Sequence, residues 1–370
     1  MAVLTPVLAQ LRLPLGGCAF HPAPPLLLHA GTAWRADGNS PLLIEAKGTT
    51  LLFSDYEPFG HTLRRQGSLE NLGPPQPIRY RNDPAPKVGK WIEAIWRAPD
   101  GRLFGWFHAE EPAPNSPLFV PYIGEAVSDD DGLNWDLRGE LLRSPPEQID
   151  TGYANGFFAG GFGDLSVLPD RGGKYLYLGF TSFVADERHQ GIAFARLPLP
   201  RPAITQAGLE IWRDGRWQPG PLLPSPLWAM RRGWRHADPD GYWGPALHYN
   251  RALNAYVMLL NHTANGAGNL LQEGIYISVN ADIADPAGWS APQMLVQGGA
   301  WYPQCIGDAP NHIPGDGDMQ AGSHTRFFLA GFSAWRLQFS RAALPGTDKP
   351  LVLTKEDFPR LFGPGLRSPW

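Results

Sequence analysis

Carboxylic acids stand at the beginnings of several apolar segments of this sequence, where a charged side chain is unexpected. Asp164 precedes "LSVLP", Glu93 lies within "WIEAIW", and Asp240 precedes "YWGPALHYN". Glu273 opens "EGIYIS", and Glu45 lies within "LLIEA". A carboxylate inside an apolar segment is unfavourable unless it is partnered or in contact with water. We therefore interpret these acids as the wall of one aqueous pocket, with a turn residue as the alternative for Asp164 and Asp240.

Two carboxyl groups that face one bond can catalyse its cleavage as acid and base. One of them gives a proton to the leaving oxygen, and a neighbouring carboxylate raises its pKa so that the proton is retained near neutral pH. The other activates a water molecule or attacks the substrate, which is the chemistry of glycoside cleavage. The sequence indicates four candidate catalytic residues: Asp164, Glu273, Glu93 and Asp240.

Aromatic and polar residues near these acids are candidates for binding a sugar. Aromatic rings stack on the apolar faces of sugars, although in a β-protein they more often belong to the core. His108, in "GWFHAEE", ends an outward-going strand, and we interpret it as structural. The candidates are Trp91, Trp243 and Tyr302 for stacking, His248 for hydrogen bonding, and Glu45 and Gln304 at the strand starts of the first and last repeats.

A recurring hairpin pattern defines the elements that must position these residues. Units begin near Leu42, Trp91, Gly163, Trp243 and Trp301, and each has an apolar strand, a short turn and a second apolar strand. A third strand follows in most units. Small antiparallel sheets that cannot bury both faces alone stack around an axis. We predict an all-β fold, a five-bladed β-propeller in one domain of residues 1–370, with a β-sandwich as the alternative.

A local motif supports this prediction. "SDDDGLNW", from Ser128 to Trp135, matches the Asp-box pattern S-x-D-x-G-x-x-W of sialidase-type propellers. We expect Asp130 to accept backbone N–H groups, Gly132 to adopt a positive φ, and Trp135 to pack between strands. The motif is a structural device, so it supports the fold and not a particular chemistry.

Composition excludes some classes of function. The net charge of −4 provides no basic surface for nucleic acid, and no segment approaches the roughly 20 apolar residues of a membrane span. Residues 1–30 are interpreted as an arm, a strand that closes the last blade, or a degenerate signal, because "LGGC" at Cys18 is similar to a lipoprotein cleavage site. Neither the compartment, the oligomeric state, nor a pairing of Cys18 with Cys305 follows from the sequence.

The five-unit organisation resembles the five-bladed β-propeller glycoside hydrolases, namely the arabinanase, xylosidase and arabinofuranosidase group with its fructosidase relatives. "GDLSVLPDRGGKYLYLGF" is similar to the repeat that carries their pKa-tuning Asp, and "EGIYISVNADIADPAGWSAPQML" to a third strand with its exit turn. The resemblance implies a carbohydrate substrate, Asp164 as modulator, Glu273 as acid, and Glu93 or Asp240 as base. Inversion or retention of the anomeric centre depends on the separation of the two carboxyl groups, and we predict inversion. The Asp base expected in the first repeat has no clear match, and Glu45 is among the nearest acids.

Two alternatives remain open. A sialidase-like hydrolase needs an arginine cluster for the substrate carboxylate and a Tyr nucleophile paired with a Glu. A carbohydrate-binding propeller without catalysis needs no pair of carboxyl groups within reach of one another. We expect no cofactor, although a structural Ca²⁺ in the channel is possible, because carboxylates and water often hold this ion in propellers.

Overall fold

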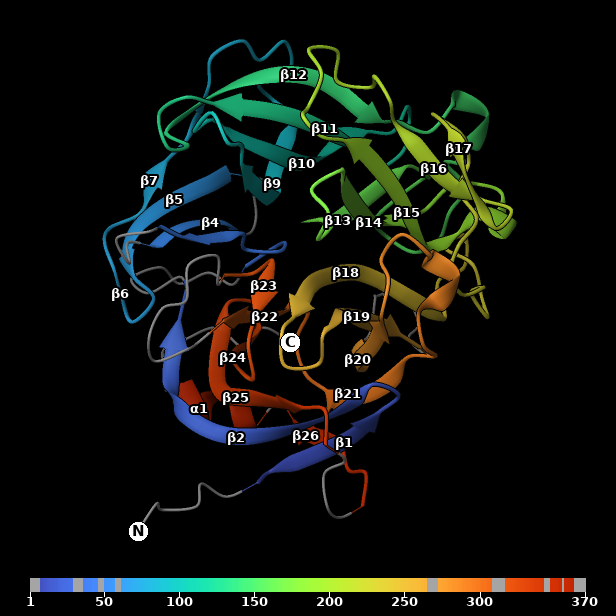
Figure 1. Cartoon of the computed structure of the whole chain (residues 1–370). Coiled ribbons are helices and arrows are strands. Elements are labelled where there is room, and N and C mark those ends of the chain that lie inside the picture. Colours follow the sequence, from blue (N-terminus) through green and yellow to red (C-terminus); the bar gives the residue numbers. More distant parts are fainter. Residues whose placement is uncertain are drawn as a thin grey trace.

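The strands of this protein form sheets that stand around a common axis as a β-propeller (Figure 1). The computed structural model describes residues 7–28, 36–45, 50–56, 61–264, 272–307, 317–342, 347–354 and 356–362. Within these ranges the chain forms four hydrogen-bonded sheets. Helical structure in the same ranges is short: α1 (Asp357–Phe362) and the 3-10 turns η1 (Pro146–Gln148), η2 (Glu187–His189) and η3 (Pro286–Gly288). None of the helices described is long and apolar enough to span a membrane.

The largest sheet contains ten strands. Its order is β3-β4-β5-β9-β10-β11-β12-β8, with β6 and β7 paired to β5. Its members are β3 (Leu42–Ile44), β4 (Thr50–Tyr56), β5 (His61–Ser68), β6 (Asn71–Leu72), β7 (Gln76–Pro77), β8 (Arg79–Tyr80), β9 (Gly89–Arg97), β10 (Leu103–Pro112), β11 (Phe119–Ser128) and β12 (Asn134–Leu142). The β3–β5 hairpin group and the β9–β12 group are joined through one parallel residue pair, His61 with Lys90. The arrangement of the sheets as a β-propeller confirms the predicted fold, whereas the number of five blades stays a prediction.

Three smaller sheets complete the ring. The second contains β13 (Phe162–Pro169), β14 (Tyr175–Ser182), β15 (Gly191–Pro198), β16 (Glu210–Arg213) and β17 (Arg216–Pro219). The third contains β18 (Gly241–Asn250), β19 (Ala255–Thr263), β20 (Gln272–Asn280), β21 (Gln293–Gly298), β23 (Gln320–Ala321) and β26 (Leu351–Leu353). The fourth contains β1 (Ala9–Leu13), β2 (Gly16–Leu27), β22 (Pro303–Gly307), β24 (His324–Leu329) and β25 (Phe332–Ser340).

The fourth sheet joins the two ends of the chain. Strand β2 pairs antiparallel with β25, so N-terminal and C-terminal segments lie side by side (Figure 1). Cys18 in β2 and Cys305 in β22 are both buried free thiols. Burial raises the pKa of the Cys305 thiol to about 12, so both the neutral form and low reactivity are expected of this group.

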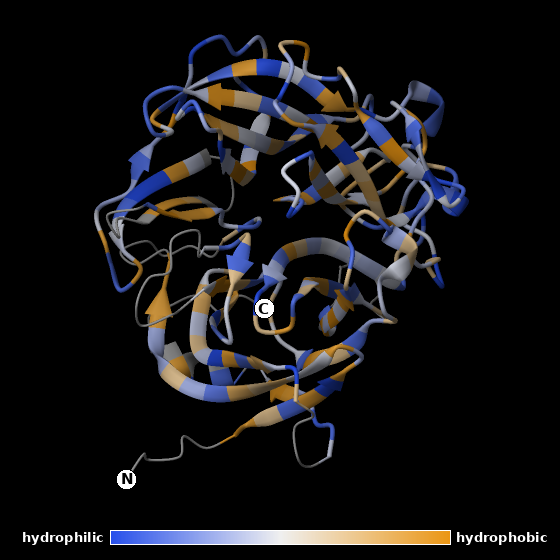
Figure 2. Cartoon of the chain, viewed as in Figure 1, coloured by the Kyte–Doolittle hydropathy of each residue, from blue (hydrophilic) through white to orange (hydrophobic). Residues whose placement is uncertain are grey.

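The core is divided among the interfaces between neighbouring sheets. Phe104 and Trp106 of β10 pack with Leu165 of β13, and Leu168 of the same strand packs with Leu247 of β18. Hydrophobic residues accordingly recur along the strands of each sheet (Figure 2). Because each sheet buries its faces against both neighbours, the inner strands are fixed with respect to one another. Side chains at their beginnings therefore have fixed relative positions.

The turn from Ser128 to Trp135 shows the local bonds expected of it. Asp130 accepts the backbone N–H of Asn134 at 2.9 Å, Gly132 has φ = 81°, and the buried Trp135 indole donates to the Gly132 carbonyl at 2.9 Å. A side chain on Gly132 would overlap the Phe53 ring. The turn thus closes the β11–β12 hairpin against β4.

We expect Asp130→Ala to lower the free energy of unfolding by about 1–2 kcal/mol, because it removes the acceptor for a backbone N–H in the turn. Asp129→Ala is the matched control, since Asp129 is exposed and its ion pair with Arg81 lies on the surface. Its expected effect is below about 0.5 kcal/mol. Urea unfolding followed by tryptophan fluorescence measures both. Equal losses in the two variants would contradict the structural role of this turn.

Candidate active site

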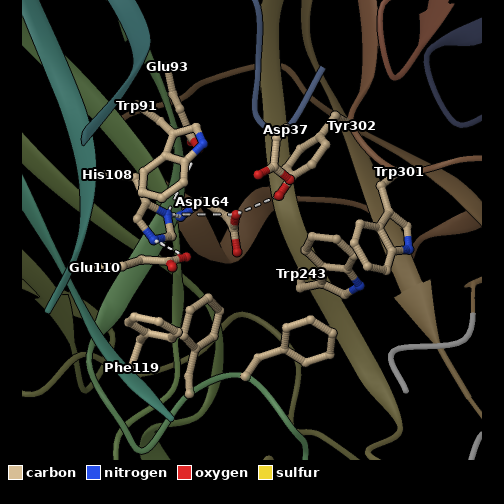
Figure 3. Close-up of a pocket in the computed structure, with 12 residues that line it drawn as sticks. Asp37, Trp91, Glu93, His108, Glu110, Phe119, Asp164, Trp243, Trp301 and Tyr302 are labelled. Atoms are coloured by element: carbon tan, nitrogen blue, oxygen red, sulfur yellow. Dashed lines mark hydrogen bonds and ion pairs between the residues drawn. The ribbon is translucent and has the colours of Figure 1, made fainter. Parts of the chain in front are cut away.

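A pocket of about 890 Å³, its mouth included, lies where the beginnings of the inner strands β9, β13, β18 and β22 approach one another. Four acids and one histidine line it together with seven aromatic rings (Figure 3). The lining residues are Asp37, Trp91, Glu93, His108, Glu110, Phe119, Phe157, Phe158, Asp164, Trp243, Trp301 and Tyr302.

Irregular pairing in three successive inner strands explains how acids enter this pocket. The β9–β10 register passes from Ala94 to Ile92, which leaves Glu93 as the extra residue. The β13–β14 register likewise passes from Gly163 to Leu165 and omits Asp164, and a shift in β18 follows Trp243. A bulge redirects the side chain of the unpaired residue. Glu93 and Asp164 therefore leave the apolar alternation of their strands and line the pocket.

Asp164 has the most constrained position of these acids. Its φ of 42° is a left-handed conformation that Asp tolerates better than most residues. Its amide donates a hydrogen bond to Nδ1 of His108 at 3.0 Å, and its side chain is 3.8 Å from the same nitrogen. A Cβ on Gly163 would lie 2.6 Å from this ring, so glycine is required for the contact. Burial raises the pKa of Asp164 to about 6, with Glu110 adding to the effect while His108 and Tyr302 oppose it.

Glu93 joins two inner strands beneath the pocket. Its side chain is almost fully buried in β9, and its Oε2 accepts the backbone N–H of Leu165 in β13 at 2.6 Å. Its other oxygen lies 3.9 Å from Nδ1 of His108. Glu93 therefore fixes the residue that follows Asp164, and we assign it a positioning role.

His108 lies between three carboxyl groups and was interpreted from sequence as structural. Nε2 is 3.3 Å from Glu110, while Nδ1 faces the Asp164 amide. Burial opposes the charged ring, but Glu110, Asp164 and Glu93 together raise the pKa of His108 to about 9. In the structure Nδ1 accepts the Asp164 amide, which describes the neutral tautomer with its proton on Nε2. A second proton on Nδ1 would break this hydrogen bond, so the bond opposes the effect of the three carboxyl groups on the pKa. The ring thus lines the pocket and also orders the groups around it.

Asp37 is a pocket acid that sequence reasoning missed. It lies in "ADGNS", before β3, and points into the same space as Asp164 and the Tyr302 hydroxyl (Figure 3). The segment after it is anchored to the inner strands: the Asn39 amide donates to the carbonyls of Leu165 at 2.8 Å and Pro245 at 3.1 Å. Asp-Gly reads as an ordinary turn, and no apolar strand surrounds it, so the sequence offered little signal.

Tyr302 lies among all four acids of the pocket. Its φ is 52°, and its hydroxyl donates to Oδ1 of Asp164 at 3.4 Å. Burial first, and then Asp164, Asp37, Glu93 and Glu110, raise the pKa of Tyr302 well above its ordinary value. The phenol is therefore a neutral hydrogen-bond donor to Asp164. Glu110, two residues beyond His108 in β10, is the second acid that the sequence analysis omitted, although strand alternation places it on the face of His108.

The aromatic residues form the pocket walls. Trp91 and Trp243, which were predicted from sequence to stack on a sugar, are more than nine-tenths buried, and Tyr302 also lines the pocket. Among the described residues neither indole nitrogen has a hydrogen-bond partner. Unpartnered buried donors are rare in proteins, and both nitrogens have almost no exposed surface in this structure. Four further aromatic residues that the sequence analysis did not predict also line the pocket: Phe119, Phe157, Phe158 and Trp301.

Asp240 and Glu273 are not among the residues that line this pocket. They flank His262 instead: Glu273 is 2.6 Å from Nδ1 and Asp240 is 3.5 Å from Nε2. Tyr276 donates to Glu273 at 3.1 Å, and the Glu273 side chain is 38% exposed. The structure thus gathers these two acids in a separate cluster at the ends of β18, β19 and β20. The sequence assignment of Glu273 as acid and Asp240 as base has no geometric support in this arrangement.

Three predicted binding residues also lie elsewhere. Glu45 accepts from the Arg97 guanidinium at 2.5 Å and 3.1 Å. Gln304 exchanges two hydrogen bonds with the backbone of Ser40, and His248 is buried beside it in a smaller cavity. Burial lowers the pKa of His248 to about 3, so the ring is neutral. None of these three residues lines the pocket.

One set of side chains in the pocket has the composition of a metal site. Donor atoms of Glu93, His108 and Asp164 lie within 4.8 Å of one another. However, Nδ1, the His108 nitrogen nearest to Glu93 and Asp164, accepts the Asp164 amide and therefore offers no free lone pair between these two acids. In this arrangement the three residues fit a hydrogen-bonded network better than a metal centre.

Comparisons with known proteins concern the fold. No protein-family model matches the chain, and no curated protein sequence is significantly similar. Among solved structures the chain is similar to an α-L-arabinofuranosidase from Lactobacillus brevis, with 14% identity, a TM-score of 0.51, and coverage of 89% of this chain and 98% of that chain. Further similar structures are an arabinanase of Bacillus subtilis (15% identity, TM-score 0.48, covering 82% and 94%) and an α-L-arabinanase of Penicillium chrysogenum (12%, 0.46, 90% and 88%). The predicted resemblance to propeller glycoside hydrolases is confirmed at the level of the fold.

Proposed function

We propose that this protein is a glycoside hydrolase that uses Asp164 and Asp37 as acid and base. The observation that carries the proposal is a buried carboxyl group with a pKa near 6 that faces a second carboxyl group in an aromatic-walled pocket. A carboxyl group with this pKa is half protonated at about pH 6 and about one-tenth protonated at pH 7, far more than an ordinary aspartic acid, and a proton donor to a leaving oxygen needs this protonated form. The fold shared with an arabinofuranosidase is consistent with the proposal.

Hydrolysis of a glycoside transfers one proton to the leaving glycosidic oxygen and removes one proton from the attacking water molecule. Asp164 gives its proton to the glycosidic oxygen as the bond from this oxygen to the anomeric carbon breaks. Asp37 takes a proton from the water molecule that attacks the same carbon, and exchange with solvent restores both groups. Asp164 thereby takes the acid role that the resemblance implied for Glu273. We retain inversion of the anomeric centre as part of the proposal, because Asp37 then needs only to activate water.

The proposal invokes a carbohydrate and water, without a cofactor; the structural calcium considered from sequence has no role in it. We also interpret the ten-stranded sheet as two blades, because its two groups meet at one residue pair. With three further sheets this interpretation gives five blades. The Ser128–Trp135 turn is, in the same interpretation, an Asp-box on the second blade.

The rival hydrolase is disfavoured by the charge of the pocket. A sialidase-like site needs arginines for the substrate carboxylate, and the described lining contains neither arginine nor lysine. Two of the arginines of the chain, Arg64 and Arg97, bond instead to the Asp131 carbonyl and to Glu45. A binding propeller without catalysis remains the second candidate, favoured by the stacking walls alone.

The experiment is a screen of aryl glycosides and polysaccharides with the purified chain. Release of reducing sugar or aryl alcohol is the expected result, and NMR of the first product is expected to show the inverted anomer. Binding of a sugar with no turnover would favour the binding propeller. Retention of configuration would remove the assignment of Asp37 as a base that acts on water.

The rate is expected to fall as the pH rises through about 6, because Asp164 then loses the proton that it must donate. Tyr302→Phe removes a hydrogen bond that favours the carboxylate form of Asp164. Without this hydrogen bond the pKa of Asp164 is expected to be higher. The alkaline limb of the kcat–pH profile is therefore expected to move to higher pH, by under about one unit. The pH dependence of kcat for the parent and the variant measures this shift. A shift to lower pH would contradict the assignment.

A further inference from the structure

The pocket combines carboxyl groups with aromatic faces and has neither lysine nor arginine among its described lining residues. Its ionisable lining consists of Asp37, Glu93, Glu110, Asp164 and the single ring of His108. Even with Asp164 protonated and His108 charged, the remaining acids leave an excess of negative charge. A ligand with a positive charge would reduce the repulsion between these acids, whereas an anionic ligand would increase it.

Glu110 is the acid whose position the proposed catalytic chemistry does not explain. Its side chain is 22% exposed, lines the pocket, and is 3.3 Å from His108. The described part of the chain shows no lysine or arginine paired with it. Its neighbour Glu111 points to the opposite face of β10 and forms a two-pronged ion pair with Arg143. Of these two consecutive glutamates, only Glu110 therefore lines the pocket.

Aromatic rings lie on the same side of the pocket as Glu110. Phe119 is on that side in Figure 3, and Phe158 packs against the His108 ring. The faces of such rings attract organic cations, and desolvation in a pocket strengthens the attraction. A hard metal ion would instead need six or more oxygen ligands, which aromatic walls do not supply. The combination of one partly exposed carboxylate with ring faces fits an ammonium group.

The buried indole N–H groups of Trp91 and Trp243 provide an independent indication of a ligand. Both line the pocket, and neither has a partner among the described residues. Oxygen atoms of a sugar would be suitable acceptors for them after a small adjustment of the side chains, because neither nitrogen has exposed surface in this structure. At Glu110 the pocket offers an acceptor with negative charge.

We propose that the pocket selects an amino sugar, and that Glu110 binds its protonated amino group. The proposal rests on the proposed glycosidase function, which is the reason to expect a sugar, and it adds that this sugar carries a positive charge. Glu110 is then a specificity-determining residue, separate from the acid and base.

The experiment measures the binding of matched sugars by tryptophan fluorescence at about pH 6. The probes are D-glucosamine, D-glucose and N-acetyl-D-glucosamine, with the corresponding galacto and manno sets, so that each set differs only at one substituent. At least one amino sugar is expected to bind about tenfold more tightly than its hydroxyl and N-acetyl analogues. Glu110→Gln, which keeps an oxygen acceptor for His108, is expected to abolish this preference. Glu111→Gln is the control for loss of a nearby negative charge and is expected to retain it.

Equal affinity for amino and neutral sugars, or no saturable binding of any amino sugar, would overturn the proposal. A preference that persists in Glu110→Gln would overturn the role of Glu110. The outcomes are separable from those of the hydrolase proposal. Hydrolysis of neutral glycosides with no amino preference removes the inference alone, whereas Glu110-dependent binding of an amino sugar without any turnover removes only the hydrolase proposal.

Discussion

Asp164→Asn is expected to lower kcat about 1,000-fold on the glycoside that the parent hydrolyses. The amide has nearly the same shape as the carboxyl group, tolerates the left-handed φ of 42°, and still accepts the hydrogen bond of Tyr302. It cannot donate a proton to a leaving oxygen with the same ease. The loss should therefore appear in kcat, with KM changed by only a few fold. Steady-state kinetics with circular dichroism of the folded variant measures it.

A control of the same chemical change comes from the second acidic cluster. Asp240→Asn also removes one carboxylate from a site beside a histidine, but that site lies outside the pocket. We expect its kcat to remain within about threefold of the parent value. A large loss in Asp240→Asn with little loss in Asp164→Asn would return the catalytic role to the residues that the sequence alone suggested.

Leaving-group chemistry gives a second and sharper check of Asp164. A 2,4-dinitrophenolate departs without protonation, so a missing general acid matters little for such a substrate. The Asp164→Asn variant should regain most of its activity on dinitrophenyl glycosides compared with alkyl glycosides. An equal loss on both substrates would show that Asp164 acts in some way other than by proton donation.

The fold could be predicted largely from periodicity. Alternating apolar segments separated by turns with Gly, Asp and Asn indicated small antiparallel sheets around an axis, and Glu93 and Asp164 were recognisable because each interrupts such a segment. The physical reason for their positions, a bulge in each strand, required coordinates. Glu273 also lies at the beginning of an apolar strand, yet it pairs with His262. The beginning of a strand specifies only the end of the propeller at which a residue lies, and not its distance from the axis.

Asp37 illustrates the limit of pattern reasoning at this site. Its position depends on hydrogen bonds from Asn39 to β13 and β18 and from Ser40 to Gln304 in β22, contacts that span 126 to 264 residues of sequence. Nothing in the local sequence reports such contacts. Gln304 was predicted from sequence to bind substrate at the start of the last repeat. In the structure it lies in β22 and holds the segment that carries Asp37.

Asp37→Asn is expected to lower kcat about 1,000-fold as well, but with a different substrate dependence. The base acts on water whichever group leaves, so dinitrophenyl glycosides should not restore activity, in contrast to Asp164→Asn. Glu45→Gln is the matched control, because Glu45 is among the acids nearest to the position where the resemblance expected a base, and its partner Arg97 lies outside the pocket. Kinetics of the three variants on dinitrophenyl and alkyl glycosides separate the roles. If dinitrophenyl substrates restore Asp37→Asn and not Asp164→Asn, the acid and base must be exchanged.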